Sequence, residues 1–253
     1  FTDPALSTHA ADIIHDMLLR YGFTSVVDTG SDPSSTRALQ RAIEAGTMAG
    51  PRIFTAGGSF VYRDGTPSYL PGIRLPELET PDQAAAMTHA VLDTGLDGVK
   101  IFSGSFISPT ETVWLPPAII AAVTGAAHGR GRFVVAHPTD RVGLENAVDN
   151  GVDVLAHTAP PAGVLAPDLL QRIIDNGVAL VPTLKLWAWE LGRAGVPAAG
   201  IRAYQDAGIG QLAAFAAAGG QVLFGTDVGY MRDYDTTDEF VAMAAAGMTF
   251  EAI

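Results

Sequence analysis

The sequence predicts an α/β fold built around a parallel sheet, and three observations lead to this prediction. Helical stretches alternate with short β-rich runs along the chain of 253 residues. Glycine follows most of the predicted helices, as expected for a left-handed C-terminal cap. The β-rich runs are nearly continuous in Val, Ile, Leu and Phe, which is typical of parallel strands covered on both faces. Strands and helices that alternate in this way form a parallel sheet.

Seven strands can be placed because one pattern recurs: a helical stretch, then glycine, then a β-rich run. Examples are "RYGFTSVVDTG", "DTGLDGVKIFSG" and "DNGVDVLAHTA". They are predicted to begin near Thr24, Arg52, Gly98, Arg132, Asp153, Val178 and Gln221. The helices are predicted over residues 10–20, 34–45, 81–94, 115–128, 141–150, 167–176 and 201–218. Thr80 followed by Pro81 is a typical N-cap and first-turn proline.

The polar residues at the strand ends favour a (β/α)8 TIM-type barrel over a nucleotide-binding open sheet. No GxGxxG turn follows the first strand, so the dinucleotide fingerprint is absent. A barrel brings the C-terminal ends of all its strands to one mouth. Polar residues close six of the predicted strands: Asp28, Lys100, His137, His157, Thr183 and Asp227.

The strand count is one short of a barrel, since the chain opens with a helix after a brief lead-in. We therefore expect the first strand to be missing from this chain. Residues 1–253 are expected to form one barrel domain excerpted from a longer protein. A natural seven-stranded barrel or an open α/β sheet is the alternative.

Composition excludes several classes of function. The net charge is −12 and no basic stripe occurs, so nucleic acid is a poor partner. No apolar run approaches the ~20 residues that span a bilayer, and no leader opens the chain, so we expect a soluble protein without a membrane partner. There are no cysteines, which excludes thiolate metal sites and fits an exported or a cytosolic protein alike. The expected partner is a small-molecule substrate. The sequence leaves open whether the chain forms a homo-oligomer.

Lys100 stands inside the apolar run "DGVKIFSG", where lysine is rare unless it is paired. Burial lowers the pKa of a lysine and favours the neutral amine. A neutral amine can add carbon dioxide and become a carbamate, an anion able to bridge two metal ions. The alternative is an ion pair with a carboxylate such as Asp28, and the sequence leaves both interpretations open.

Three further strand ends carry metal-ligating side chains: His137 in "VVAHP", His157 in "VLAHT" and Asp227 in "FGTDVG". Taken singly, each histidine is more often a hydrogen-bonded structural residue, and the aspartate could cap a turn. Taken together at one barrel mouth, two imidazoles and a carboxylate indicate a metal site.

These four motifs, in this order and one per strand–helix unit, resemble the amidohydrolase superfamily, and the imidazolonepropionase-like and Xaa-Pro dipeptidase-like branch above all. The resemblance implies a zinc-type binuclear metal centre, with Lys100 carboxylated by carbon dioxide and bridging the two ions. It implies His137 and His157 on the second metal, and Asp227 on the first metal and as general base. The implied reaction is hydrolysis of an amide, cyclic amide or related C–N or ester bond by a metal-bound hydroxide.

The family also places a His-x-His pair at the end of its first strand, and this chain contains none. His9 and His15 lie in the first predicted helix with the wrong spacing. In the family the pair is often followed by phenylalanine and a loop, which is how "FTDPALST" begins. We therefore expect the missing ligands just before Phe1.

Substrate contacts are predicted from the loops that follow the strands. The long segment 58–78 carries Tyr62, Arg63 and Tyr69, and Tyr230 follows Asp227. Arg63 could pair a substrate carboxylate, and Trp187 and Trp189 could line an apolar pocket. Two other functions compete with the hydrolase. One is a metal-free Schiff-base lyase or aldolase that uses Lys100 as nucleophile, and the other is a degenerate barrel without catalysis.

Overall fold

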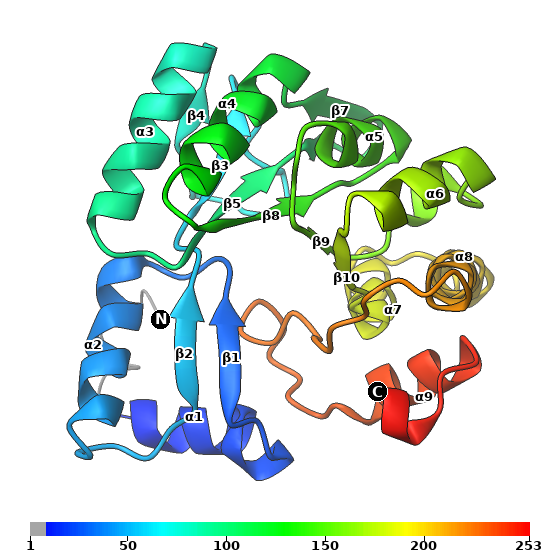
Figure 1. The fold of residues 1–253 in the computed structure, drawn as a ribbon. Coiled ribbons are helices and arrows are strands. Elements are labelled where there is room, and N and C mark those ends of the chain that lie inside the picture. The colour runs from blue at the N-terminus through cyan, green and yellow to red at the C-terminus, as the bar shows by residue number, and fades with distance from the viewer. Residues whose placement is uncertain (1–8) are drawn as a thin grey trace.

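Six parallel strands form the larger sheet of the computed structural model, which describes residues 9–253 (Figure 1). The lead-in loop predicted at the start of the chain, residues 1–8, lies outside this range. The strand order is β10-β9-β8-β5-β3-β4. The bounds are β3 Ser59–Tyr62, β4 Glu77–Leu78, β5 Gly98–Phe102, β8 Phe133–His137, β9 Val154–Ala156 and β10 Ala179–Val181.

A second, two-stranded parallel sheet is formed by β1 (Ser25–Asp28) and β2 (Arg52–Thr55), below the larger sheet in Figure 1. Asp97 joins the two sheets, because its amide donates to the Thr55 carbonyl (2.8 Å) and its carboxylate accepts from the Thr55 amide (3.0 Å). At the opposite edge, Leu180 of β10 bridges Val222. The strands thus follow one another as in a barrel, but no closed barrel forms within residues 9–253.

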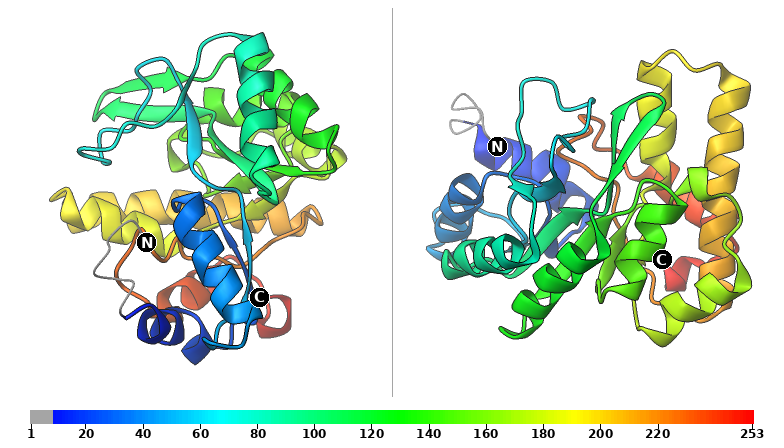
Figure 2. Two further views of the ribbon diagram at one scale, coloured as in Figure 1. Left: turned by 90° about the vertical axis from the view of Figure 1, so that its left-hand side faces the viewer. Right: turned by 90° about the horizontal axis from the view of Figure 1, so that it is seen from above.

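Helices cover one face of the larger sheet, as the two views in Figure 2 show. Val99, Ile101, Val134 and Ala136 point to this face and form one core with apolar residues of the helices. The helices are α1 Ala10–Met17, α2 Pro33–Glu44, α3 Pro81–Asp93, α4 Pro117–His128, α5 Arg141–Asp149, α6 Pro167–Asp175, α7 Leu184–Arg193, α8 Ala198–Ala217 and α9 Thr237–Ala245. No helix among the described residues is long and apolar enough to cross a membrane.

Local sequence explains the helix ends. The predicted Thr80 cap is confirmed, because its hydroxyl accepts from the Gln83 amide (3.2 Å). Asp32 and Asp140 cap α2 and α5 in the same way. The two "DNG" glycines, Gly151 and Gly177, have φ of 84° and 66°, so the chain leaves α5 and α6 through a left-handed residue that costs glycine little.

Several predictions of individual elements were wrong. The expected strand near Gln221 is reduced to the single bridge at Val222. The predicted loop 58–78 contains β3 and β4, and an antiparallel hairpin, β6 (Gly104–Ser108) with β7 (Glu111–Trp114), follows β5. The segment after the predicted strand near Val178, which carries Trp187 and Trp189 and was expected to be a loop, is helix α7. These elements are short or lack a capping signature, and tertiary contacts determine them.

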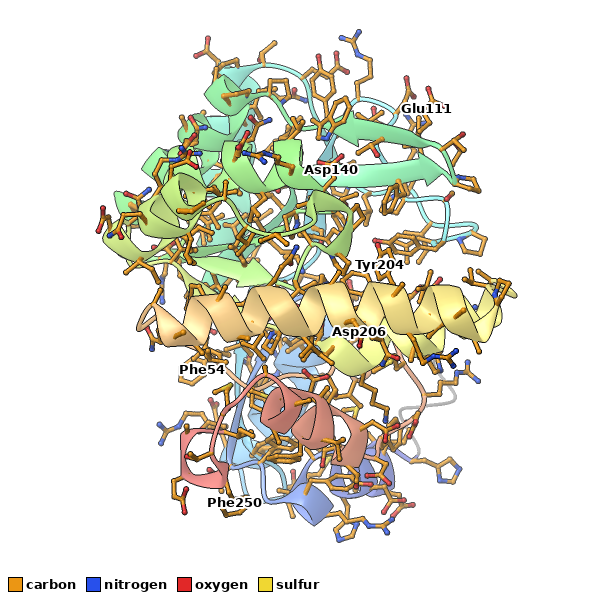
Figure 3. The ribbon with its side chains drawn as sticks, turned by 90° about the vertical axis from the view of Figure 1, so that its right-hand side faces the viewer. Phe54, Glu111, Asp140, Tyr204, Asp206 and Phe250 are labelled. Carbon is orange, nitrogen blue, oxygen red and sulfur yellow. The ribbon has the colours of Figure 1, made fainter. Side chains whose placement is uncertain are left out.

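Helix α8 is the longest, at 20 residues, and crosses the molecule between the larger sheet and the part that holds β1, β2 and α9 (Figure 3). Tyr204 and Asp206 lie on different sides of it. The Tyr204 ring contacts Trp187 of α7 at a centroid distance of 5.4 Å. Through this contact α8 supports the helix that follows β10.

Candidate active site

The alternation of parallel strands sets the direction of the first site residues. Lys100 and Phe102 alternate with Val99 and Ile101, which point into the helix-covered core. In the register of β5 with β8, Phe102 faces His137. Lys100 and His137 therefore lie on the sheet face away from the helices. The prediction that Lys100 closes its strand was wrong, since two further residues of β5 follow it.

Lys100, His137 and His157 border one space on this face. The His137 and His157 rings are 4.6 Å apart between centroids, and the Phe102 ring is 4.6 Å from His137. The Lys100 ammonium nitrogen lies 5.8 Å from the centre of the Phe102 ring. All three site residues are at most 8% exposed. Asp227 follows Val222 and Leu223 and is only partly exposed.

Burial shifts the pKa of each of these groups toward its neutral form. Desolvation lowers the pKa of Lys100, opposed by the negative charges of Asp227 and Asp28. Desolvation also holds the pKa values of His137 and His157 well below the usual range, and the charge of Lys100 adds to this. The pKa of Asp227 is raised by desolvation, with Lys100 acting in the opposite direction. At neutral pH both imidazoles therefore have free lone pairs.

The backbone around the site is strained at its strand ends. His157, Thr183 and Asp227 have φ of 79°, 46° and 63°, in the left-handed region that non-glycine residues rarely adopt. Such residues gather at functional sites. The Thr183 hydroxyl contacts Nδ1 of His157 at 2.6 Å, which fixes the orientation of the ring and leaves Nε2 without this partner.

The donor chemistry fits a zinc-type ion, because two neutral imidazoles and the Lys100 amine border one space, and the charge of the Asp227 carboxylate acts on that amine. Within residues 9–253, however, no three His, Asp or Glu side chains converge closely enough to hold an ion by themselves. The described part of the chain therefore supplies a partial ligand set. The ion pair predicted as the alternative for Lys100 does not form with Asp28, whose carboxylate accepts from Thr36 and from backbone amides.

The predicted substrate residues divide into two groups. The Tyr69 and Tyr230 rings meet at 5.9 Å, and desolvation raises the pKa of both hydroxyls, with the charge of Asp227 adding to the shift. These two tyrosines therefore lie beside the site. Tyr62 instead packs against the main core, and Arg63 pairs with Glu79 at the surface. The structure does not bring Tyr62 or Arg63 to the other site residues.

An aromatic wall continues from the tyrosines to Trp189, which was predicted to line an apolar pocket, and includes two charged residues that the sequence left unassigned. Trp189 contacts Tyr230 at 5.5 Å, and the Tyr230 hydroxyl donates to Glu190 at 3.0 Å. Arg193 lies 4.4 Å above the Trp189 ring and pairs with Glu190. Glu190 and Arg193 were missed because the segment was predicted as a loop. The helix formers of this segment, with Trp189 and Arg193 four residues apart, were the available signal of a helix.

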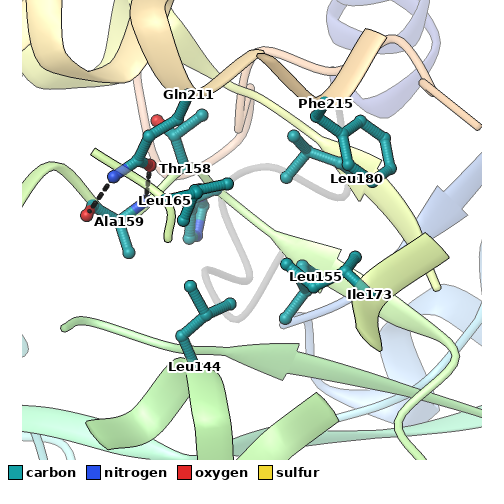
Figure 4. A pocket seen from close by; sticks show the side chains of 10 residues that line it. Leu144, Leu155, Thr158, Ala159, Leu165, Ile173, Leu180, Gln211 and Phe215 are labelled. Atoms are coloured by element: carbon teal, nitrogen blue, oxygen red, sulfur yellow. Dashed lines mark hydrogen bonds between the residues drawn. The ribbon is translucent and has the colours of Figure 1, made fainter. Parts of the chain in front are cut away.

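Behind His157 lies a small cavity of about 20 Å³ between the sheet and its helices (Figure 4). Its walls are mainly leucine, isoleucine and phenylalanine, and its polar groups are already bonded. Gln211 accepts from the Ala159 amide (2.8 Å) and donates to the Ala159 carbonyl (2.7 Å) and the Gly163 carbonyl (2.6 Å). Gln211 thus anchors the segment after His157, and the cavity is a packing gap behind the site.

Glu239 of α9 is fully buried, and burial raises its pKa to about 7. Because the folded-state pKa lies above the unfolded value near 4.5, the folded protein holds this proton more tightly. This tighter proton binding contributes about 3 kcal/mol to the free energy of unfolding. The contribution is fully present below about pH 4.5 and is lost as the pH rises toward 7. Glu239→Gln should remove this part of the pH dependence, measured by denaturant unfolding between pH 4.5 and 8. An unchanged slope in Glu239→Gln, with exposed Glu251→Gln as control, would contradict the assignment.

Comparisons with known proteins show which proteins share the sequence and the fold of this chain. No family model matches the sequence. An uncharacterized protein of Mycobacterium tuberculosis is 29% identical over 232 residues, which cover 88% of this chain and 59% of the relative. A solved structure described as an amidohydrolase is 25% identical with a TM-score of 0.75, over 98% of this chain and 64% of its own. The chain has the fold of the amidohydrolase superfamily.

Two further solved structures with this fold extend the comparison. A Xaa-Pro dipeptidase with methionine in its active site superposes with a TM-score of 0.81 at 23% identity, covering 98% of this chain and 65% of that one. The A. niger ochratoxinase gives 0.80 at 18% identity, covering 99% and 63%. The predicted resemblance to the amidohydrolase superfamily is therefore confirmed at the level of fold. The chain spans less than two thirds of the length of these proteins.

Proposed function

We propose that this amidohydrolase-fold chain carries the catalytic site of a metal-dependent hydrolase that cleaves amide or related carbon–nitrogen bonds. The observation that carries the proposal is the meeting of Lys100 of β5, His137 at the end of β8 and His157 directly after β9 on one face, toward the C-terminal side of the sheet, with Asp227 near enough for its charge to act on Lys100. In a parallel α/β fold this is where active sites are built. The solved structures with this fold include a dipeptidase and an amidohydrolase, which supports the same reaction class.

Two divalent ions, of which zinc is the first candidate, would be held by His137, His157, Asp227 and the carbamate of Lys100. Bound there, the metal would lower the pKa of a water molecule and polarise the scissile carbonyl. The carbamate forms when the neutral amine of Lys100 attacks carbon dioxide and releases one proton. Burial prepares Lys100 for this reaction, because it lowers the pKa of the amine.

Asp227 would act as the general base and acid. Its carboxylate takes the proton of the attacking water and delivers it to the leaving nitrogen. The raised pKa of Asp227 suits both transfers, since a group that titrates closer to neutrality can accept and return a proton. The left-handed backbone at Asp227 restricts the conformations open to this residue, whose charge acts on Lys100.

The substrate would be a small molecule with an apolar or aromatic group beside the scissile bond. Tyr69, Tyr230 and Trp189 form a continuous aromatic wall next to Asp227. Such a wall binds flat or apolar groups and leaves the tyrosine hydroxyls for polar contacts. Tyr62 and Arg63 stay predictions as substrate residues, with Arg63 free to act only after it leaves Glu79.

The proposal predicts about two zinc or similar ions per chain by elemental analysis, in protein expressed with bicarbonate in the medium. The same protein should hydrolyse members of a panel of dipeptides and N-acyl amino acids, and a chelator should abolish this activity. Absence of bound metal together with absence of hydrolysis would contradict the proposal. The Schiff-base alternative predicts instead that borohydride traps a carbonyl substrate on Lys100 without any metal.

A further inference from the structure

The sequence contains only two lysines, Lys100 and Lys185, and both are buried. All other cations of the chain are arginines or histidines. Lys185 is 4% exposed and is the second residue of α7, so it requires partners for its charge. Unlike Lys100, it lies outside the candidate metal site.

The Lys185 ammonium group is bonded to the segment between Asp227 and α9. It pairs with the Asp233 carboxylate at 2.8 Å and donates to the carbonyls of Asp233 (3.4 Å) and Asp235. The pKa of Asp233 is lowered, and the hydrogen bond from Lys185 is the main cause. At its near end, the same segment turns through the bond from the Met231 amide to the Asp227 carbonyl (3.2 Å). The chain that leaves Asp227 is therefore fastened by one buried cation.

Glu239 of α9 makes the second contact between this part of the chain and α7. Its carboxylate accepts from the amides of Leu184 (2.9 Å) and Lys185 (2.7 Å), and so caps the first turn of α7. Thr183 directly precedes these residues and contacts Nδ1 of His157. Glu239 thus holds the backbone that orients His157, while Lys185 holds the backbone that leaves Asp227.

We propose that Lys185 and Glu239 are a positioning pair that fixes Asp227 and His157 relative to each other. The inference rests on the proposed function, because it assigns these residues a role in that site. Neither residue touches the reacting atoms. Lysine suits the task because its ammonium group has three donors on a flexible stem and can satisfy three acceptors at once. Misplacement of catalytic groups by about 1 Å lowers rates by about 100-fold.

The test compares Lys185→Met, Lys185→Arg and a control, Arg172→Met. Arg172 of α6 pairs with Asp149 of α5 (3.0 Å), and both residues lie far from Asp227 in the sequence. For Lys185→Met we expect kcat to fall about 100-fold with KM within about threefold of the wild type. Lys185→Arg, which keeps the charge, should recover most of kcat. Arg172→Met should leave both constants near the wild type.

A second readout does not depend on activity. In protein labelled with ¹⁵N-histidine, the ring signals of His157, assigned with His157→Gln, should shift in Lys185→Met and return in Lys185→Arg. Wild-type kcat and unmoved His157 signals in a folded Lys185→Met variant would overturn the proposal, as would an equal loss in Arg172→Met. If the wild-type protein hydrolyses nothing, the proposed function fails, and the His157 signals alone decide the role of the pair.

Discussion

Replacing Asp227 with asparagine should lower kcat for amide hydrolysis by about 10³, within the range that a general base contributes. Asparagine has nearly the same size and keeps one ligating oxygen, but it cannot accept the proton of the attacking water. The left-handed backbone at residue 227 tolerates asparagine as well as aspartate, so the site should keep its shape. The measurement is kcat and KM on the best substrate of the panel, with metal content determined on the same sample.

The control for this variant is Asp206→Asn, an exposed carboxylate on α8 whose removal makes the same change in charge. It should keep wild-type kcat. If Asp227→Asn retains both its metal and its turnover, Asp227 is not the general base, and another carboxylate must be sought. Glu190 would be the next candidate, because its charge already contributes to the raised pKa of Asp227.

The fold class and the main site residues could be predicted from the sequence because the signals are local. A parallel strand covered on both faces is a short apolar run, and the residue that ends it is visible in the sequence, as His137 is at the end of β8. Glycine caps such as Gly151 mark where each unit begins. These features need no knowledge of distant contacts.

What could not be predicted depends on contacts between distant residues. Helix α7 has no side-chain cap of its own, because Glu239, which lies 55 residues after Leu184, caps it. The strand expected near Gln221 has one ladder partner, Leu180, and is reduced to a bridge. Arg63 was predicted to bind substrate from its loop position, but its pairing with Glu79 depends on β3 and β4 lying side by side. Each outcome was set by tertiary structure.

Replacing Lys100 with methionine should abolish hydrolysis and, at the same time, stabilise the metal-free protein. Methionine fills the space of the lysine stem without an amine. Among the lysines of residues 9–253, Lys185 alone forms an ion pair, and the charges of Asp227 and Asp28 offset the burial of the Lys100 amine only in part. Removing a buried polar group of this kind should raise the unfolding free energy by about 2 kcal/mol. Functional sites commonly carry such a cost in stability.

The two lysines therefore give opposite expectations for the same substitution. Lys185→Met breaks a buried pair and leaves the Asp233 and Asp235 carbonyls without their donor, so its unfolding free energy should fall by about 2 kcal/mol or more. Urea unfolding of both variants without metal, with elemental analysis before chelation, tests the contrast. A Lys100→Met protein that is less stable than the wild type, and still binds metal, would show that Lys100 is a structural residue. A more stable protein without metal or activity would indicate that Lys100 is kept for the chemistry of the site.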